Sequence, residues 1–451
     1  MTGSTPDSTA STDTIVALAT APGRAAVAVV RLSGPGAGAA LEALTGAELP
    51  AARRASRRRL SHPANGEVLD EALILWFPGP ASYTGEDVAE LQLHGGRAVT
   101  AGVLEALLAR PGLRAAEPGE LTKRAFLNGK LDLTAAEAVN DLIAADTAAQ
   151  RRQALRQGAG ALAALYDGWR GRLIRVLAHL EADIDFPDED LPGDIRARIG
   201  PEIEALATDM AAHLDDSRRG ERLRDGIEVA ILGAPNVGKS SLLNALARRE
   251  AAIVSPIAGT TRDVIEVHLD LAGYPVTLAD TAGLREAAGG DGIEAEGIRR
   301  ALARAAAADL KIALFDATAD PDPATLTLVD ADTLVVVNKT DRTPAPATIG
   351  RHKVLGLSVL EGQGISTLLE QLTQDVVERW QEREAPILTR ARHRQAVTEA
   401  LEALRRSQGA KMPELAAEDV RLAARALGRI TGRIDVEDLL DVIFREFCIG
   451  K

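Results

Sequence analysis

The chain has 451 residues, a formal net charge of −13 at pH 7, and 46% hydrophobic and 26% charged residues. This composition is typical of a globular protein, and the length suggests about three domains at roughly 150 residues each. The acidic balance argues against a protein that coats nucleic acid through its overall electrostatic field.

Two further features of the composition restrict the setting. The single cysteine, Cys448, excludes an intrachain disulfide and argues against a cysteine-built zinc site. The most apolar run, residues 26–32, is too short to span a bilayer, and the polar residues 1–12 lack the apolar segment of a signal peptide. We therefore expect a cytoplasmic protein with no membrane association and a disordered tail at residues 1–12.

Residues 1–130 are predicted to form one α/β domain after that tail. Runs rich in Val, Ile and Leu, such as TIVALAT and AAVAVVRLSG, are bounded by Gly and Pro, as expected for strands. Five arginines interrupt this pattern, and a solvated loop is the favoured interpretation, with a local polyanion-binding patch as the alternative. These arginines are Arg53, Arg54, Arg57, Arg58 and Arg59.

From Leu131 the periodicity becomes helical. Thr134 and Glu137 have the spacing of a capping box at the start of a helix, and a second apolar stripe begins at Pro201. A longer stripe at steps of three and four lies between them, at Leu162, Leu165, Trp169, Leu173, Val176 and Leu180. The chain is helical again near its end, so residues 131–222 and 377–451 are predicted to form one helical domain.

Strands and helices alternate between residues 223 and 376, which predicts a parallel-dominated, doubly wound sheet. Because helical segments flank it on both sides, this α/β domain is predicted to be inserted in the helical domain. The expected fold class is thus a multidomain α/β protein.

The segment GAPNVGKSS follows a predicted strand and precedes a helix. Its spacing, Gly233-x4-Gly238-Lys239-Ser240, allows backbone N–H groups to surround phosphate oxygens, while Lys239 supplies a charge and Ser240 a hydroxyl ligand for Mg²⁺. The dipole of the following helix also favours an anion. This pattern predicts a nucleotide-binding P-loop.

Two later motifs define the nucleotide. Asp280-Thr281-Ala282-Gly283 ends a predicted strand, where a carboxylate can reach the metal and a glycine N–H the γ-phosphate. Asn338-Lys339-x-Asp341 follows another strand, and Asp341 can accept hydrogen bonds from the guanine N1–H and amino group, which adenine does not offer. The order of the motifs favours GTP over the alternative of a capped surface turn.

The segment SPIAGTTRDV lies between these motifs, where a switch region carries a threonine to Mg²⁺. Thr261 is the expected ligand, and a simple Gly/Thr turn before a strand is the alternative. Leu284 follows the DxxG motif, where Ras has a glutamine that orients water. Leucine cannot hydrogen-bond to water, so hydrolysis must obtain that group and an additional positive charge elsewhere.

The residues expected to bind GTP are Asn236, Val237, Gly238, Lys239, Ser240, Ser241, Ser255, Pro256, Ile257, Ala258, Gly259, Thr260, Thr261, Asp280, Thr281, Ala282, Gly283, Asn338, Lys339, Asp341 and Ser358.

With GAPNVGKSS, SPIAGTTRD, DTAGLRE and NKTD in order and a terminal FCIGK, the chain resembles the MnmE (TrmE) family of tRNA modification GTPases. Further matching segments are DTIVALATAPGRAAVAVVRLSG, FPGPASYTGEDVAELQLHGG and PGELTKRAFLNGKLDLTAAEA. The resemblance implies an N-terminal folate-binding domain, a helical domain and an inserted Ras-like G domain. It also implies a homodimer that acts on tRNA with the flavoprotein MnmG, as a heterotetramer. The two proteins would add an aminomethyl or carboxymethylaminomethyl group to C5 of the wobble uridine (U34).

The resemblance also implies particular site residues. A K⁺ ion would replace an arginine finger, bound by Asn236, Ser255, Thr260 and the Ile257 carbonyl, and completed when two G domains pair. Glu294, matched by its E-x-x-G-I pattern, would orient the attacking water. A 5,10-methylene- or 5-formyl-tetrahydrofolate would bind at Arg31, Glu90, Lys130 and Lys451, and Cys448 is a candidate catalytic residue beside it.

One residue departs from the family pattern: the guanine-contacting loop usually reads Ser-Ala-x, and here it is Ser358-Val359-Leu360. Two other functions remain open at this point. A pure switch GTPase would not need the folate residues, and a stand-alone folate enzyme would act on a small one-carbon substrate without MnmG.

Overall fold

The computed structural model describes residues 13–185, 195–249, 251–253, 266–280, 303, 305–381, 386–434, 437–445 and 447–450. The chain divides into two compact units, which we describe separately. One contains residues 1–140, 157–199 and 406–451, and the other residues 141–156 and 200–405.

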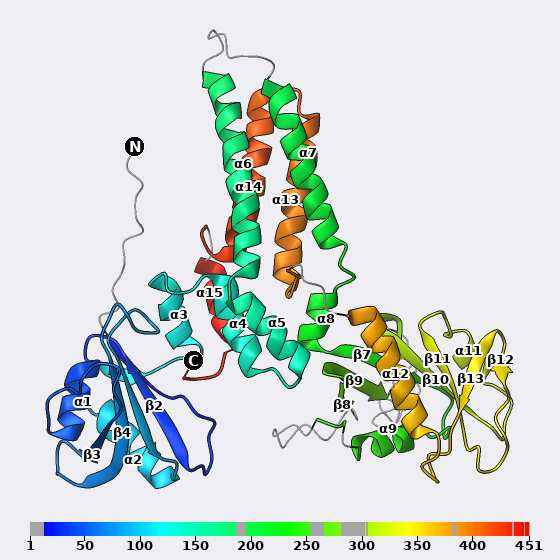
Figure 1. Cartoon of the computed structure of the whole chain (residues 1–451), viewed down its shortest axis with the longest axis horizontal. Helices are drawn as coiled ribbons and strands as arrows, with labels where there is room; N and C mark the ends of the chain where they lie inside the picture. The colour runs from blue at the N-terminus through cyan, green and yellow to red at the C-terminus, as the bar shows by residue number, and fades with distance from the viewer. Residues whose placement is uncertain are drawn as a thin grey trace, which may run out of the picture. The chain divides into compact units, whose positions relative to one another are not determined.

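The first unit contains a six-stranded sheet with the strand order β3-β4-β5-β2-β1-β6 (Figure 1). Only β6 pairs in parallel, with β1, and the other pairs are antiparallel. The strands are β1 (Thr14–Leu18), β2 (Val27–Ser33), β3 (Ser56–Ser61), β4 (Val68–Phe77), β5 (Val88–His94) and β6 (Leu113–Ala115). The expected loop at the five arginines is therefore only partly correct, because three of them lie in β3.

Helices α1 (Ala37–Thr45) and α2 (Arg97–Leu108) pack on the same face of this sheet. Their buried residues, such as Leu41 and Leu107, share one core with Val30, Ile74 and Leu91 of the strands. Helix α3 (Glu120–Leu127) packs on the other face, where its Leu121 joins a smaller cluster with Ile15 and Ala17 of β1.

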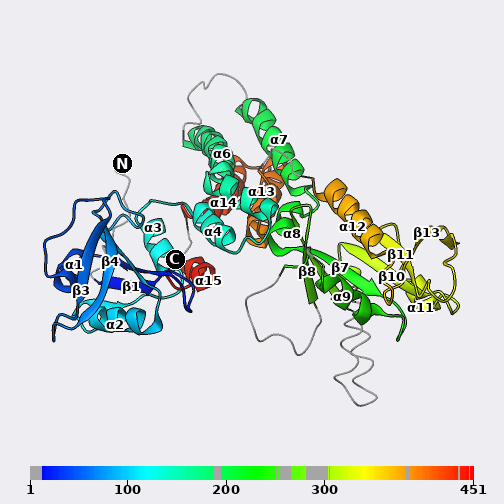
Figure 2. The same ribbon diagram turned by 60° about the horizontal axis from the view of Figure 1, so that its bottom comes forward.

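The rest of the first unit is helical. Helix α6 (Ala161–Asp185) lies along α14 (Pro413–Thr431), as Figures 1 and 2 both show. The predicted stripe of α6 is buried at Leu162, Trp169, Leu173, Val176 and Leu180. Helix α15 (Glu437–Arg445) contributes Leu440 and Phe444 to a cluster with Leu133 and Ala136.

The predicted capping box at Thr134 is wrong. Helix α4 (Leu133–Ile143) is capped by Asp132, whose Oδ1 accepts the N–H groups of Thr134 (2.8 Å) and Ala135 (3.1 Å), so Thr134 is not the N-cap. The pattern of apolar residues does not reveal that Asp132 already caps this first turn. Helix α7 (Ile195–Leu214) contains Pro201, and the apolar stripe predicted to begin there is buried at Ile203, Leu206 and Met210.

The second unit contains a seven-stranded sheet with the order β12-β13-β11-β10-β7-β9-β8. The five central strands are parallel, and β8 and β12 pair antiparallel at the edges. The strands are β7 (Ile227–Leu232), β8 (Glu266–Leu271), β9 (Tyr274–Asp280), β10 (Leu310–Asp316), β11 (Thr333–Asn338), β12 (Thr348–Ile349) and β13 (His352–Gly356).

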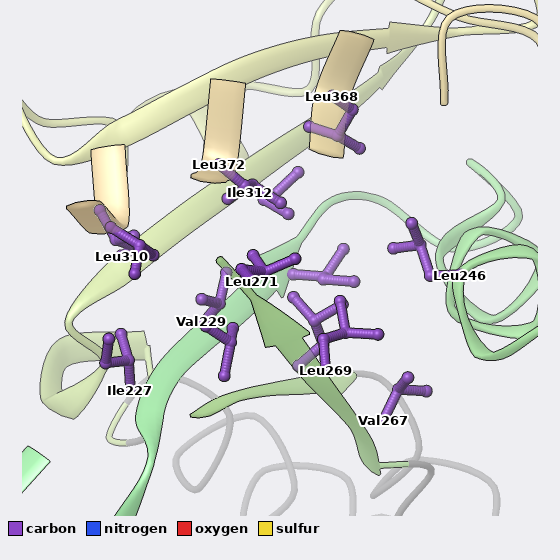
Figure 3. Packing of buried hydrophobic residues seen from close by; sticks show 14 of the residues in the cluster. Ile227, Val229, Leu246, Val267, Leu269, Leu271, Leu310, Ile312, Leu368 and Leu372 are labelled. Atoms are coloured by element: carbon purple, nitrogen blue, oxygen red, sulfur yellow. The ribbon is translucent and has the colours of Figure 1, made fainter. Parts of the chain in front are cut away.

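Helices cover both faces of this sheet, as a doubly wound fold requires. Helices α9 (Lys239–Ala247) and α12 (Ile365–Trp380) share a core with the strands. Figure 3 shows Leu368 and Leu372 of α12 above Ile312 and Leu310 of β10. The opposite face buries Phe315 and smaller clusters near α11 (Pro323–Leu326). The expected fold class is confirmed.

The other described helices of the second unit precede or follow its sheet in the chain. They are α5 (Ala148–Gly158), most of α7 (Ile195–Leu214), α8 (Arg219–Asp225) and α13 (Ala391–Gly409). The predicted domain boundaries at residues 130, 222 and 376 divide the chain into more parts than these two units. They stay a prediction. No helix in the described ranges is long and apolar enough to cross a membrane.

Candidate functional site

The P-loop runs from the end of β7 to the start of α9 and passes very close to two neighbouring strands. Gly233 has φ +154°, and a Cβ there would lie 2.5 Å from the Leu314 carbonyl oxygen. Gly238 has φ +107°, and a Cβ there would lie 2.3 Å from Nδ2 of Asn338. Both positions therefore require glycine, for backbone conformation and for space.

Lys239 lies across this loop. Its side chain is buried, and its ammonium group donates hydrogen bonds to the carbonyl oxygens of Gly233 (2.8 Å) and Ala234 (2.9 Å). The positive charge is thus held within the curve of the loop, at the N-terminus of α9. A helix N-terminus and a cation together favour an anionic group.

The loop also has backbone donors to offer to an anion. Among the described residues, the N–H groups of Val237 and Gly238 have no acceptor. Ser240 and Ser241 follow in the first turn of α9 and are exposed, so their hydroxyl oxygens are at the same end of the helix. Hydroxyl oxygen is a hard ligand of the kind that Mg²⁺ prefers. The predicted phosphate and Mg²⁺ residues on this side are thus brought together.

Asn338, the last residue of β11, connects the P-loop to the loop expected to bind guanine. Its buried side chain donates from Nδ2 to the Val237 carbonyl oxygen (2.9 Å) and accepts at Oδ1 from the Val359 N–H (3.1 Å). The second contact uses only the backbone of Val359, which explains why valine is compatible with this position. The Asn338 amide thus both donates and accepts a hydrogen bond within the protein.

Asp341 lies beside this connection. The buried Ser358 donates its hydroxyl to Oδ1 of Asp341 (2.6 Å) and accepts the N–H of Glu361 (3.2 Å). Within the described ranges, Oδ2 of Asp341 accepts no hydrogen bond. The carboxylate is thus fixed in orientation by one oxygen and retains acceptor capacity on the other.

Lys339 adds a second connection between the same two loops. It has φ +67°, and its ammonium group donates to the Asn236 carbonyl oxygen (3.2 Å) and forms an ion pair with Asp316. Burial would raise the pKa of the Asp316 carboxyl, but hydrogen bonds from Lys339 and Thr318 hold it below its usual range. Asp316 was not anticipated from the sequence, although it ends the strand LKIALFD at the same sheet edge.

The other predicted GTP residues are only partly covered. Asp280 ends β9, and its backbone pairs with Ile231 of β7 beside the P-loop. The segments 255–261 and 281–283 and the residues Leu284, Glu294 and Lys451 lie outside the described residues. Their roles stay predictions.

Two predicted folate residues meet in the sheet of the first unit. Arg31 of β2 and Glu90 of β5 are cross-strand partners, and Nε of Arg31 donates to Oε1 of Glu90 (2.8 Å). Both side chains are partly buried, at 26% and 20% exposure. A half-buried pair of this kind can offer both a cation and an acceptor to one ligand.

Lys130 and Cys448 lie elsewhere on the same unit. The ammonium group of Lys130 donates to the Pro80 carbonyl oxygen (3.0 Å), in the loop between β4 and β5. Cys448 is exposed, and its backbone carbonyl accepts the N–H of Gly119 (3.3 Å), so the C-terminal segment lies against the start of α3. Of the predicted folate residues, Arg31 and Glu90 are therefore in direct contact. Among the described residues, neither of them contacts Lys130 or Cys448 through a hydrogen bond or an ion pair.

Two neighbours of this region were not predicted. Tyr83 shares a hydrogen bond with Thr122 (2.9 Å), and burial raises its pKa, which Thr122 and the charge of Arg31 oppose. Arg124 is buried and forms ion pairs with three carboxylates, those of Asp13 (2.7 Å), Glu86 (3.1 Å) and Glu120 (3.2 Å). In the sequence, the segments SYTGED and ELTKR are marked only by the family resemblance. No apolar periodicity marks an ion-pair network of this kind.

The contact between Gly238 and Asn338 leads to a direct prediction. In Gly238→Ala, the added methyl group displaces the Asn338 amide, which breaks two buried hydrogen bonds. At about 1 kcal/mol each, we expect GTP affinity to fall about 30-fold, measured by titration with a fluorescent GTP analogue.

The matched control is Gly350→Ala in the same unit, where φ is +60° and no atom lies within 4 Å of the added Cβ. It carries the backbone strain without the contact, so its GTP affinity should stay near that of the wild type. Equal losses in the two variants would show that backbone strain alone is responsible.

Comparison with known proteins covers almost the whole chain. The "GTP-binding protein TrmE N-terminus" family matches residues 14–130, and the "MnmE helical domain" family matches residues 133–448. The tRNA modification GTPase MnmE of Paramagnetospirillum magneticum is 61% identical over 443 residues, covering 97% of this chain and 100% of the relative. That of Parvibaculum lavamentivorans is 60% identical with the same coverage.

Among solved structures, the G domain of the T. maritima FeoB iron transporter covers 34% of this chain and 99% of its own length. It is 26% identical, with a TM-score of 0.25. These two relatives are matched over their full length, and the two family matches follow one another along the chain. The chain therefore belongs to the MnmE (TrmE) family of tRNA modification GTPases.

Proposed function

We propose that this chain hydrolyses GTP in the modification of tRNA, as a K⁺-stimulated enzyme that works with MnmG on the wobble uridine. The observation that supports it most is the pair of connections from the guanine loop to the P-loop, through Asn338 and Lys339. Because of these connections, a base bound at Asp341 and phosphates bound at Lys239 belong to one ligand. That ligand is a guanine nucleotide.

Selection of guanine follows from the orientation of Asp341. Ser358 already donates to Oδ1 of Asp341. The carboxylate can still accept hydrogen bonds from a base that offers two N–H donors on one edge, as guanine does. Asp341 is exposed in the free protein, but a bound base would exclude water from it. Adenine would then leave this acceptor unpaired, and an unpaired acceptor that is shielded from water is costly. The carboxylate of Asp341 therefore selects guanine in two ways: it stabilises bound guanine and destabilises bound adenine.

Bound Mg²⁺ and K⁺ would supply positive charge to the phosphate oxygens during hydrolysis. Ser240 fits Mg²⁺ as a hydroxyl ligand, and Thr261 is its proposed second ligand. The exposed side chain of Asn236 fits K⁺, because it has an amide oxygen and no hydrogen-bond partner among the described residues. Ser255, Ile257 and Thr260 are the other proposed K⁺ ligands, and Glu294 is the proposed residue that orients water.

The potassium proposal is tested by comparing GTP turnover in KCl and in NaCl at equal ionic strength. We expect turnover to be at least about tenfold faster in KCl, because Leu284 offers no group to orient water and no positive charge. Asn236→Ala should remove most of the difference. Equal rates of the wild type in the two salts would refute the K⁺ mechanism.

We further propose that the first unit binds a 5-formyl- or 5,10-methylene-tetrahydrofolate at Arg31, Glu90, Lys130 and Lys451. Arg31 can hold a carboxylate, and Glu90 has a second oxygen that can accept from a pterin N–H edge. Cys448 lies on the same unit, on an exposed segment, and its chemical role is part of this proposal. The folate would supply the one-carbon group.

Calorimetric titration with 5-formyltetrahydrofolate tests this site. We expect Arg31→Gln to weaken binding at least about tenfold, the cost of about one charge-assisted hydrogen bond. The matched control is Arg97→Gln, an exposed arginine of α2 on the opposite face of the sheet, which should bind like the wild type. Wild-type protein that gives no heat would exclude the folate site.

The proposed reaction joins these parts with a partner. A homodimer of this chain and MnmG, in a heterotetramer, would add an aminomethyl or carboxymethylaminomethyl group to C5 of U34. Nucleoside mass spectrometry of tRNA from a strain lacking this protein should show loss of the modified uridine. The wild-type gene should restore it and the Gly238→Ala gene should not. Unchanged modification in the deletion strain would overturn this assignment.

A further inference from the structure

One face of the N-terminal sheet is left largely open by the helices. On the covered face, Ile74, Leu91 and Val30 are fully buried against α1 and α2. On the other face, the apolar cluster of α3 among the described residues includes Ile15 and Ala17 of β1, and Leu73 of β4 is 45% exposed. Arg31 and Glu90, the proposed folate residues, point to this open face because they alternate with the buried residues of β2 and β5.

The strand register continues this face to the edge strand β3. One cross-strand row contains Val29, Gln92, Leu73 and Arg57, and the adjacent row contains Arg31, Glu90 and Leu75. Arg59 follows Arg57 by two residues, so both arginines share the face of Arg31 and Glu90. From strand spacing and rise, the Cα atoms of Arg57 and Glu90 are about 12 Å apart.

The edge of this face is strongly cationic. The side chains of Arg57 and Arg59 are 76% and 65% exposed, and both pair with one carboxylate, that of Glu71. These two ion pairs hold the pKa of Glu71 below its usual range. Arg54 precedes the strand and has no ion pair among the described residues. Because one glutamate pairs with two arginines, this edge carries an excess of positive charge, although the net charge of the whole chain is −13.

Charged residues also protect exposed sheet edges from pairing with other chains. That role requires charge along the edge but does not require both exposed arginines to share a face with the folate residues. Guanidinium groups match phosphate oxygens in two-pronged geometry, and fixed cations near a reaction site attract a polyanion to it. The position of these arginines fits such a ligand.

We propose that Arg57 and Arg59 bind the phosphate backbone of the tRNA whose wobble base is modified beside Arg31 and Glu90. This inference rests on the proposed function in tRNA modification and adds a docking surface for that substrate. Glu71 then acts as an internal competitor of the phosphates, since it occupies both guanidinium groups in the free protein.

The test uses the full chain and a synthetic anticodon stem-loop RNA, with affinity measured at several KCl concentrations. In Arg57→Gln/Arg59→Gln, we expect weaker binding, and the slope of log affinity against log salt should fall by about 1.4 to 1.8. Glu71→Gln should bind more tightly than the wild type, because it releases both arginines. K⁺-dependent GTP turnover should stay at the wild-type level in both variants.

The matched control is Arg218→Gln in the second unit. Arg218 is 67% exposed and pairs with Glu221 (3.8 Å), so it resembles Arg59 in exposure and pairing but lies at the N-cap of α8. It should bind RNA like the wild type.

The possible outcomes separate the two proposals. Wild-type protein that does not bind the RNA would overturn both this inference and the proposed function in tRNA modification. If the wild type binds the RNA and the double arginine variant binds it with the same affinity, this inference alone would be overturned. Unchanged RNA binding together with self-association of that variant would assign Arg57 and Arg59 to protection of the sheet edge instead.

Discussion

The nucleotide site depends on one buried carboxamide. Asn338 donates to the P-loop at Val237 and accepts from the guanine loop at Val359, so it holds two segments more than 100 residues apart in sequence at fixed separation. A carboxylate or an aliphatic side chain of similar size could not make both contacts, because only an amide combines a donor and an acceptor at this spacing. The arrangement also requires glycine at position 238, because a Cβ there would collide with the Asn338 amide.

The sequence located this site well, and the reasons are physical. Parallel strands end at one edge of a sheet, so motifs that follow β7, β9 and β11 converge whatever the intervening helices do. Asp316 escaped prediction because its function is indirect: it holds Lys339, which in turn contacts the P-loop backbone. A residue that positions another through a backbone contact leaves no spacing signal in a single sequence.

The first unit was less predictable from residue patterns alone. Arg31 and Glu90 are 59 positions apart, and only the register of β2 against β5 brings them together. Register depends on turns and bulges that the pattern of apolar residues does not fix. The same applies to β3, where three arginines within a strand concealed the alternation that identifies strands elsewhere. Here the resemblance to a family supplied what periodicity could not.

The connections to the inserted sheet suggest why such an insertion is tolerated. The entering helix α8 meets the segment that leaves the sheet so closely that a Cβ on Gly220 would lie 2.1 Å from the Leu388 carbonyl oxygen. Arg394, at the start of α13, ties them further by ion pairs to Glu221 of α8 (2.8 Å) and to Asp216 just before it (2.6 Å). Entry and exit are thus adjacent and charge-paired, which is the condition under which a domain can be inserted with little disturbance to its host. Within the same unit, helix α5 contacts the β8–β9 turn, where the Ala149 N–H donates to the Gly273 carbonyl oxygen (3.1 Å). The two strands joined by that turn lead to the segments expected to sense the γ-phosphate, so α5 is fixed by its backbone to the same pair of strands.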